Sequence, residues 1–406
     1  MSSSFSGKNI LVGITGSIAV YKVCDWVRSL SKAGAQVTVV MTESAAQFVS
    51  PLTFAALSGN RVYVKMFDPV GEEDIPHINL ARKNDFILVA PATAATIARM
   101  AGGLADDLLS AIVLAAKVPI IVCPAMNSNM YLHPATQANL QRLKEYGYTV
   151  VNPATGTMAC GEEGPGRLPE WESVSEACLG AITAQDMTGR SILITAGPTE
   201  EPLDPVRYLS NRSSGKMGYS LARTARRRGA RVTLVAGPTH LADPPDVSIV
   251  HVRTALEMYD QVICRFDDAD IIVKAAAVSD FRPASTMAQK IKKQGSELQL
   301  QLAGNSDILF ELGERNKTER NPKILVGFAA ESQKVLEEGK RKLQEKNLDC
   351  IVVNDISADD AGFSVDTNRV TLLDRFGGVH ELPLLSKDET ADRIWDAVIF
   401  QAAHLS

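Results

Sequence analysis

The sequence predicts an α/β fold made of two Rossmann-like domains in tandem, and three observations lead to this prediction. The apolar run Asn9–Ile14 is followed by a glycine turn and by helical periodicity from Ile18 to Leu30, which is how an α/β mononucleotide unit begins. The same order returns after a second apolar run, Ser191–Gly197. A chain of 406 residues also exceeds one ordinary core, so two domains of roughly 200 residues are expected.

Short apolar runs that end at turn residues predict the other strands. In the first half these runs are Gln36–Val40, Phe86–Ala90, Val118–Val122 and Thr149–Val151, and Met41–Ser44 is expected to cap a helix. In the second half they are Val247–Val250, Ile271–Val273, Leu298–Leu302, Ile324–Val326 and Cys350–Val353, with an edge hairpin at Arg369–Leu373 and Val379–Leu382. Both halves therefore repeat a β-α-β order.

The second half echoes the first with one difference. Gly229–Val235 is similar to Gly34–Val40, and the restart of the pattern predicts domains at residues 1–188 and 189–406. Between its first strand and its helix the second half is about 13 residues longer, and the extra residues lie within Pro198–Lys216. An insertion beyond the carboxyl end of a strand, where α/β sheets bind ligands, is expected to be functional.

The composition is that of a globular enzyme and excludes several other classes. Hydrophobic residues make up 45% and charged residues 22% of the chain. A net charge of -5 argues against a nucleic-acid partner, and the five arginines within 223–231 are expected to form a solvated helix end. The six scattered cysteines, the absence of a signal-peptide pattern at Met1–Phe5 and the absence of a long apolar run predict a cytoplasmic protein without a membrane partner.

A glycine- and proline-rich segment, Asn152–Arg167, carries the most reactive side chain of the first half. Glycine and proline disfavour a helix or a central strand, so this segment is predicted to be a long loop. It contains Cys160, followed by two carboxylates and an arginine. A loop that presents a thiol beside titratable groups is a candidate active-site flap, although a surface loop with an incidental thiol is the alternative.

Four loops at predicted strand ends are rich in small hydroxyl-bearing residues. They are Thr15–Ala19, Met41–Ala45, Pro91–Thr96 and Pro124–Asn127. Amides and hydroxyls of this kind can surround a phosphate at a helix N-terminus without a lysine. The four loops together predict a phosphate-bearing ligand in the first half.

With Gly103–Leu109, this set of loops resembles the homo-oligomeric flavin-containing cysteine decarboxylases. Pro124–Asn127 and Ala159–Gly164 look like the motif pair of the phosphopantothenoylcysteine decarboxylase branch of that family. The resemblance implies a flavodoxin-like flavoprotein fold. His77 falls where that family has its active-site histidine; considered alone, it is more typical of a satisfied structural side chain. Met130 corresponds to a methionine near the substrate, with a core position as the alternative.

The resemblance implies FMN as the cofactor and assigns residues to it. The implied FMN contacts are Gly16, Ser17, Ile18, Thr42, Thr93, Ala94 and Met126. Loss of CO2 from a cysteine amide needs an electron sink, which oxidation of the thiol carbon to a thioaldehyde by a flavin provides. Cys160 would then protonate the resulting enethiolate, Asn127 would hold the substrate carboxylate, and His77 would assist the oxidative or decarboxylating step.

The inserted loop of the second half is the most specific stretch of the chain. Ser213–Lys216 lacks the upstream glycine of a P-loop, so that motif is rejected. Asp204–Gly218 instead resembles the signature of phosphopantothenate-cysteine ligase. Matching segments are Ala275–Asp280, Gln289–Lys293, Asn305–Ile308, Gly327–Glu331 and Lys342 with Lys346. Two departures are Ser306, where the family often has proline, and Lys274 before the alanine run.

The ligase resemblance implies CTP as a co-substrate, because the carboxylate is activated as an acyl-cytidylate before the cysteine amine attacks. Charge on the phosphates calls for fixed cations and Mg2+. Asn211 and Lys290 are the implied catalytic residues, although a solvated lysine cluster is an alternative for Lys290, and Asp280 is the candidate metal ligand. The implied substrate and nucleotide contacts are Arg207, Arg212, Lys274, Ala275, Ala276, Asp280, Lys290, Asn305, Ser306, Asp307, Ile308, Phe328, Lys342 and Lys346.

The two resemblances cover nearly the whole chain and imply consecutive steps of coenzyme A biosynthesis. The implied substrates are 4'-phosphopantothenate, cysteine and CTP, and the implied assembly is a homo-oligomer with trimers of decarboxylase domains and paired ligase domains. Two rivals stay open. A flavin-binding regulatory protein of this fold typically lacks the loop cysteine, and a nicotinamide dehydrogenase would need the missing GxGxxG motif.

Overall fold

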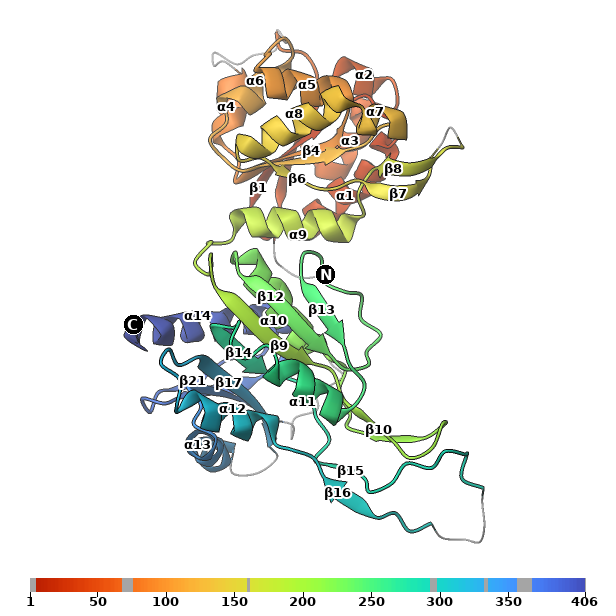
Figure 1. The fold of residues 1–406 in the computed structure, drawn as a ribbon. Coiled ribbons are helices and arrows are strands. Elements are labelled where there is room, and N and C mark those ends of the chain that lie inside the picture. Colours follow the sequence, from red (N-terminus) through yellow and green to blue (C-terminus); the bar gives the residue numbers. More distant parts are fainter. Residues whose placement is uncertain are drawn as a thin grey trace. The chain divides into compact units, whose positions relative to one another are not determined.

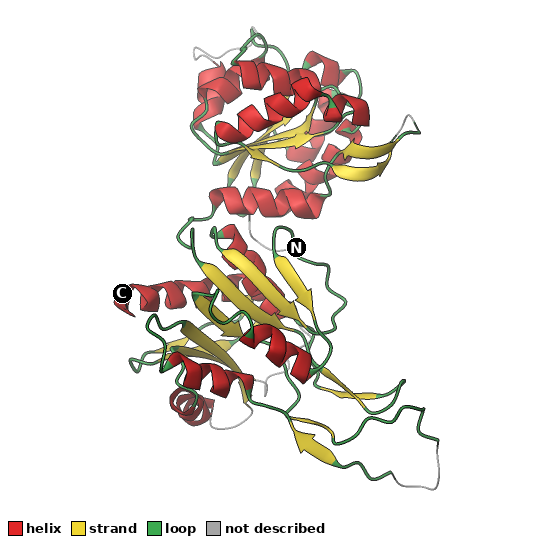
Figure 2. Ribbon diagram, viewed as in Figure 1, coloured by secondary structure: helices red, strands yellow, loops and turns green. Residues whose placement is uncertain are grey.

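The computed structural model describes residues 5–67, 76–158, 161–292, 298–331, 335–355 and 367–405. The chain divides into two compact units, one up to Ala184 and one from Gln185. Each unit has a central sheet with helices on both faces (Figure 1, Figure 2). In the described part of the chain, no helix has the length and apolar character needed to cross a bilayer.

The first unit is built on a six-stranded sheet in the order β3-β2-β1-β4-β5-β6, with every neighbouring pair parallel. Its strands are β1 (Asn9–Ile14), β2 (Gln36–Met41), β3 (Val62–Tyr63), β4 (Phe86–Ala92), β5 (Ile120–Pro124) and β6 (Thr149–Val150), beside a ribbon of β7 (Ala154–Thr157) and β8 (Glu163–Arg167). Its helices are α1 (Val20–Lys32), α2 (Glu43–Ala46), α3 (Pro51–Ser58), α4 (Pro76–Arg82), α5 (Ala94–Gly102), α6 (Leu108–Ala115), α7 (Ser128–Leu132), α8 (Pro134–Glu145) and α9 (Trp171–Ile182). The predicted α/β class is confirmed.

Two hydrophobic clusters lie on opposite faces of this sheet. Successive side chains of a strand point to opposite faces, so Ile10 and Val12 pack with α1, α3 and α9. Leu11 faces the other way and packs with α4, α5, α6 and α8. Both faces of β1 are thus buried, which is why its sequence is a continuous apolar run.

The segment predicted to be a long loop is instead a β-hairpin. β7 and β8 pair antiparallel, with an irregularity between Ala154 and Thr155. The prediction was wrong because a two-stranded ribbon outside the main sheet does not need the apolar residues of a central strand. Its glycines allow the hairpin to pack closely against neighbouring backbone. A Cβ added at Gly166, where φ is +137°, would overlap the carbonyl oxygen of Met126.

The second unit has an eight-stranded sheet in the order β13-β12-β9-β14-β17-β18-β20-β21. The main strands are β9 (Ser191–Ala196), β12 (Arg231–Ala236), β13 (Ser248–His251), β14 (Ile271–Lys274), β17 (Ile324–Glu331), β18 (Cys350–Asp355), β20 (Val370–Asp374) and β21 (Val379–Glu381). Three small ribbons pair β10 (Glu200–Pro202) with β11 (Tyr208–Ser210), β15 (Phe281–Pro283) with β16 (Leu302–Gly304), and β19 (Thr367–Asn368) with β22 (Leu385–Ser386). The first six main strands are parallel, and β20 and β21 form the antiparallel edge that the sequence predicted.

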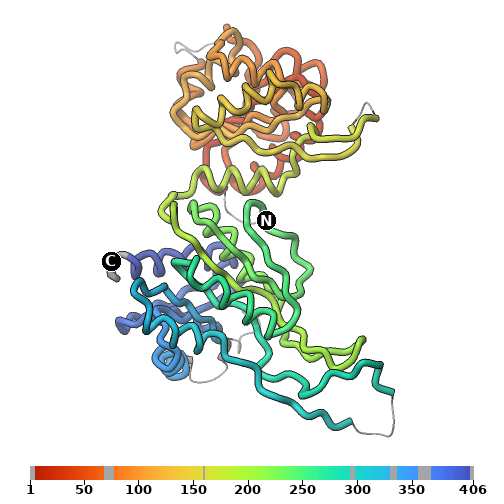
Figure 3. Tube along the Cα trace, in the orientation of Figure 1, coloured from red at the N-terminus to blue at the C-terminus, as the bar shows by residue number. Residues whose placement is uncertain are grey.

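Within the described residues, the helices that cover this sheet are α10 (Lys216–Arg227), α11 (Ala255–Ile263), α12 (Ile308–Asn316), α13 (Val335–Glu345) and α14 (Lys387–Leu405). The cluster on one face contains core residues of α10 and α14, and the cluster on the other contains those of α11, α12 and α13. The ribbons β10–β11 and β15–β16 extend away from the main sheet (Figure 1, Figure 3).

Two further expectations for this unit were wrong. The strand expected at Leu298–Leu302 occurs as β16, which begins only at Leu302. The arginine-rich end of α10 is also not simply solvated. Arg228 is 7% exposed and pairs with Asp186 at 2.6 Å and Asp396 at 2.8 Å. A periodic pattern cannot show that Asp186, which precedes β9, and Asp396 of α14 pack beside this run and supply its carboxylates.

Candidate active sites

A cavity of about 810 Å³ lies at the carboxyl ends of β1, β2, β4 and β5 in the first unit. This is the edge where open α/β sheets bind ligands. Six of the seven residues predicted to contact FMN line it: Gly16, Ser17, Thr42, Thr93, Ala94 and Met126. The structure thus brings together residues from four loops that are up to about a hundred positions apart in the chain.

Helix starts and hydroxyl groups shape this cavity. Thr42 and Thr93 are the N-caps of α2 and α5, and their side chains accept from the amides of Ala45 and Thr96. The Thr15 hydroxyl donates to the Pro91 carbonyl at 2.5 Å and accepts from the Thr93 amide at 3.0 Å, which ties the first loop to the third. The cap within Met41–Ser44 was predicted, and both caps aim helix N-termini at the cavity, where an anion is stabilised.

A second cavity of about 530 Å³ adjoins the first and shares Ser17, Ala125 and Met126 with it. Ile18, the seventh predicted FMN contact, and Asn127 line this second cavity together with the β7–β8 hairpin. The hairpin is held by hydrogen bonds. The Met126 amide donates to the Gly166 carbonyl at 2.9 Å, the Ser128 hydroxyl donates to the Pro165 carbonyl at 2.7 Å, and the Asn127 amide donates to the Glu162 carboxylate.

The remaining predicted residues of the first unit fall in different places. Cys160 lies outside the described residues. His77 is half-buried in the first turn of α4 and lines neither of the two cavities. Met130 lines the larger cavity and is 50% exposed, so it is not a core residue. The segment after β3 also lines that cavity through Lys65 and Phe67, which the sequence did not single out because β3 is only two residues long.

The second unit has a cavity of about 720 Å³ at the carboxyl ends of β9, β14, β17 and β18. Seven predicted ligase residues line it: Asn211, Arg212, Ala275, Ala276, Asp280, Phe328 and Lys342. The Asn211 amide donates to the Val278 carbonyl at 2.9 Å, and the Asn305 amide donates to the Ser279 carbonyl at 2.8 Å. These bonds fix the loop after β14 between the inserted loop and the start of α12.

Two predicted lysines of this unit lie beside the cavity rather than in it. Lys274 is buried with its Nζ 3.7 Å from the Met258 sulfur, and burial lowers the pKa of Lys274 to about 7. Lys346 pairs with Asp307 at 2.7 Å. Burial is the largest single influence and would raise the pKa of Asp307, but the hydrogen bond and charge of Lys346, together with backbone hydrogen bonds at the start of α12, outweigh it and the pKa is lowered. Lys346 therefore holds the start of α12, whereas Lys342 lines the cavity.

The other predicted contacts also lie outside this cavity lining. Arg207 is 3.7 Å from the carboxylate of Asp204, at the turn of the β10–β11 ribbon. Lys290 is exposed in the long connection between β15 and β16, which projects from the sheet (Figure 1). Ser306 is exposed, and Ile308 is a core residue at the start of α12.

Comparisons with known proteins match these two units to two families. The Flavoprotein family matches residues 1–183, and the DNA/pantothenate metabolism flavoprotein C-terminal domain matches residues 187–401. The coenzyme A biosynthesis bifunctional protein CoaBC of Bacillus subtilis is 45% identical over 386 residues, which cover 94% of each chain. The chain belongs to the CoaBC family. The CoaBC protein of Escherichia coli is 43% identical over 400 residues, which cover 98% of each chain.

A solved C-terminal domain of a CoaBC protein is 39% identical and covers 54% of this chain and 100% of its own length, with a TM-score of 0.47. Membership of the CoaBC family makes the chain a bifunctional enzyme of coenzyme A biosynthesis, with a decarboxylase in the flavoprotein domain and a ligase in the C-terminal domain. The alternative of a flavin-binding regulatory protein is not favoured.

Three residues that line the ligase cavity were missed from the sequence. They are Asn354, Asn368 and Lys387. Asn354 closes a buried strand, and Lys387 begins the last helix. Single polar residues at such ends carry no pattern that separates a ligand contact from an ordinary cap.

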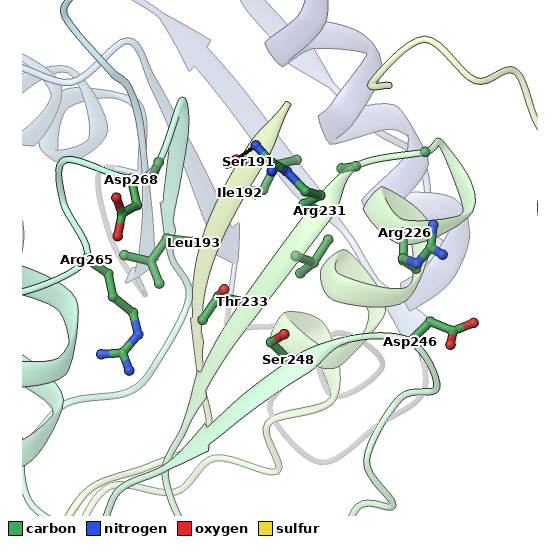
Figure 4. A pocket seen from close by; sticks show the side chains of 14 residues that line it. Ser191, Ile192, Leu193, Arg226, Arg231, Thr233, Asp246, Ser248, Arg265 and Asp268 are labelled. Atoms are coloured by element: carbon green, nitrogen blue, oxygen red, sulfur yellow. Dashed lines mark hydrogen bonds between the residues drawn. The ribbon is translucent and has the colours of Figure 1, made fainter. Parts of the chain in front are cut away.

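A further cavity, of about 520 Å³, lies at the opposite edge of the ligase sheet, at the amino ends of β9 and β12. In Figure 4, Arg265 and Asp268 lie on one side of it and Arg226 and Asp246 on the other. The Arg231 guanidinium donates to the Ser191 hydroxyl at 2.9 Å at its rim. Positive and negative side chains alternate around this cavity, and it lies away from the edge where α/β sheets bind ligands.

Proposed function

We propose that the chain converts 4'-phosphopantothenate to 4'-phosphopantetheine in two steps. Residues 189–406 join cysteine to 4'-phosphopantothenate with CTP, through an acyl-cytidylate, and residues 1–188 decarboxylate the product with FMN. The observation that carries this proposal is that each unit has a separate cavity at the carboxyl edge of its sheet. Six of the seven predicted FMN contacts line the first, and seven of the predicted ligase residues, including Asn211, Asp280 and Lys342, line the second.

The lining of the first cavity fits FMN. The N-termini of α2 and α5 and the hydroxyls of Ser17, Thr42 and Thr93 suit a phosphate. Gly16 allows close packing of two loops, because a Cβ there would lie 2.5 Å from the Ser44 Cβ. When bound, FMN supplies reversible two-electron oxidation of the substrate thiol.

The chain's own residues then handle the carboxylate and a proton. Asn127, in the lining of the smaller cavity of the first unit, holds the substrate carboxylate through its side-chain amide. Cys160, on the connection between β7 and β8, protonates the product after CO2 has left. His77 lines neither cavity, which supports a site shared between subunits of a trimer, where a histidine reaches a neighbour's flavin.

In the ligase, fixed cations balance the charge of the nucleotide. Arg212 and Lys342 line the cavity with Asp280, which would hold Mg2+ together with phosphate oxygens and water. In the described residues there is no group of three His, Cys, Asp or Glu side chains that could hold a metal, as is usual for an ion bound mainly through a nucleotide. Lys290 lies on a projecting connection, which supports pairing of ligase domains so that it reaches a partner's phosphates. A cytoplasmic location stays a prediction.

The decisive experiment incubates the full chain with 4'-phosphopantothenate, cysteine, CTP and Mg2+. We expect pyrophosphate and 4'-phosphopantetheine, a yellow protein, and no product without CTP. Asn211→Ala should slow pyrophosphate release on the order of 10- to 100-fold and leave decarboxylation of supplied 4'-phosphopantothenoylcysteine intact. Asn127→Ser keeps the α7 cap and should do the reverse, so each variant is the control for the other. A colourless protein, or release of pyrophosphate without CTP dependence, would contradict the proposal.

A further inference from the structure

The first turn of α10 opens on the ligase cavity. Gly215 is the N-cap residue, with φ +75°, and the run from Gly215 to Gly218 lines the cavity. A glycine has no side chain that could accept from the first amides of the helix. The first turn therefore presents backbone donors and the positive end of a 12-residue helix to whatever occupies the cavity.

Lys387 reaches this turn from the far end of the chain. β19 and β22 pair with Asn368 opposite Leu385, which places Asn368 beside Lys387, the first residue of α14. The Lys387 ammonium donates to the Asn368 Oδ1 at 2.9 Å, and the Asn368 amide lies 3.3 Å from the Met217 sulfur in the first turn of α10. Lys387 is 7% exposed, yet its side chain lines the cavity.

Contacts between the two helices fix this position. Asp388, the neighbour of Lys387, pairs with Arg223 at 2.9 Å and with Arg227 at 3.0 Å, both on α10. The Trp395 indole of α14 donates to the Leu221 carbonyl of α10 at 3.1 Å. The start of α14 is therefore held against α10 on two turns, and the Lys387 ammonium has a defined place next to the first turn of α10.

Asn354 supplies an independent sign of a ligand. Cys350 and Val352 of β18 pack in the cluster under α10 and α14, so the alternation of the strand turns Asn354 to the same face. Asn354 is 9% exposed and lines the cavity, but its Oδ1 accepts no hydrogen bond from any described residue. A buried polar atom without a partner is costly, and a ligand donor in the cavity would satisfy it.

We propose that Lys387 and Asn354 are further ligand-binding residues of the ligase. The Lys387 ammonium and the first amides of α10 bind a phosphate group, and the Asn354 Oδ1 accepts from a hydroxyl or N–H of the same ligand. This inference rests on the ligase reaction proposed above. Two substrates of that reaction combine a phosphate with such a donor: CTP, through its ribose, and 4'-phosphopantothenate, through its hydroxyl and amide groups.

The test measures pyrophosphate release by the full chain while CTP, 4'-phosphopantothenate and cysteine are varied in turn. Lys387→Met keeps the aliphatic stem and removes the charge, and it should raise the KM of one phosphorylated substrate on the order of 10- to 100-fold. The substrate whose KM rises identifies the source of the phosphate. The KM of cysteine should stay within about 2-fold, and Lys387→Arg should recover part of the loss. Lys340→Met, at an exposed position on α13, is the matched control.

Asn354→Leu separates ligand binding from a structural role. Leucine has the same branching at Cγ and no polar atom, so the unfolding midpoint of the ligand-free chain should not fall, whereas the KM of the same phosphorylated substrate should rise about 10-fold. A lower midpoint with unchanged KM values would overturn the proposal. This variant also carries the test if Lys387→Met does not fold.

A failure of the proposed ligase reaction can be distinguished from a failure of the proposed roles of Lys387 and Asn354. If the unaltered chain released no pyrophosphate, calorimetric titration of the full chain with CTP and with 4'-phosphopantothenate would replace the kinetics. Weaker binding of either compound to Lys387→Met than to Lys340→Met would support the subsite. Equal binding of both compounds to the two variants, with decarboxylation of supplied substrate intact, would overturn it.

Discussion

The two carboxyl-edge cavities occupy equivalent places in two parallel sheets, but their linings differ in charge. The first is lined by the hydroxyls of Ser17, Thr42, Ser44, Thr93 and Thr96 and by two cationic side chains, Lys65 and Arg99, and Arg99 is paired with Asp106 at 3.0 Å. The second is lined by four cationic side chains, Arg212, Lys216, Lys342 and Lys387. Helix N-termini suffice for a single phosphate, whereas a leaving pyrophosphate needs fixed positive charge. The fold thus sets the place of each site, and the lining sets its chemistry.

The largest expected effect is a loss of decarboxylase turnover while the ligase activity is retained. Cys160→Ser should lower formation of 4'-phosphopantetheine at least about 100-fold, because the serine hydroxyl is a much weaker acid for the final protonation. Release of CO2 and of pyrophosphate should continue, measured as trapped CO2 and by a phosphate assay. Cys264→Ser, at an exposed cysteine of the ligase unit, is the control. Loss of CO2 release in Cys160→Ser would show that the thiol acts earlier.

The next largest effect should be a loss of bound flavin from the first cavity, with the second cavity unaffected. Gly166→Ala places a Cβ against the Met126 carbonyl at a φ of +137°, so the hairpin must move away from the loop that borders both cavities of the first unit. We expect the flavin bound per chain, read from visible absorbance, to fall several-fold, with pyrophosphate release unchanged. Gly59 also has a positive φ, of +70°, but open space around it, so Gly59→Ala should keep its flavin.

The parts of each cavity that come from strand ends could be predicted from the sequence. Apolar runs identify β1, β2, β4 and β5, and Thr42 and Thr93 are recognisable caps because a hydroxyl precedes each helix. In a parallel sheet the carboxyl ends meet at one edge, so short-range patterns already assemble most of the first cavity. The echo between the two halves located the inserted loop that contains Asn211, whereas the role of Asn211 and the Ala275–Asp280 loop came from the family resemblance.

The parts that depend on distant packing could not be predicted. The pairing of β19 with β22 brings Asn368 and Lys387 to the cavity, and both strands are only two residues long. The ligase resemblance selected both Lys342 and Lys346 as ligand contacts, but Lys346 pairs with Asp307 at 2.7 Å instead of lining the cavity. Hydrogen bonds and ion pairs between segments far apart in the chain have no periodicity, so a pattern-based analysis misses them.

A smaller effect concerns a lysine buried beside the second cavity. Lys274→Met should leave the KM of CTP within about 3-fold, because the Lys274 side chain lies against Met258 rather than in the cavity. It should raise the unfolding midpoint at pH 6. Burial lowers the pKa of Lys274 to about 7, so the charged form is disfavoured in the fold, and its cost disappears as pH rises from 7 towards the unfolded value near 10.4.

Thermal unfolding of the ligase unit at several pH values checks this prediction. The difference between Lys274→Met and the unaltered chain should be largest at pH 6 and should shrink by pH 10. Lys340→Met, at an exposed lysine, should show no such trend. A large rise in the KM of CTP would instead place the Lys274 ammonium among the charges of the second cavity and strengthen the contrast with the first.

The smallest expected effect tests the helix that carries Lys387. Burial raises the pKa of Asp392 on α14 to about 6, and nearby Arg227 and Arg228 only partly offset it. The folded chain therefore keeps a proton that the unfolded chain releases near pH 3.9, and stability falls as pH rises from about 4 to 6. Asp392→Asn should remove this loss and stabilise the ligase unit by about 1 kcal/mol at pH 8, a value reduced for solvent screening, with little change at pH 4.

Asp396→Asn is the matched control for this prediction, because it sits one turn further along α14 and removes an ion pair of 2.8 Å with Arg228. It should lower the unfolding midpoint at pH 8, opposite in sign to Asp392→Asn. Both variants should keep the flavin of the first cavity, because their partners lie on α10 and α14. If Asp392→Asn also lowered the midpoint, its carboxylate would be charged and stabilising in the fold, and the ion pairs would extend along the whole first half of α14.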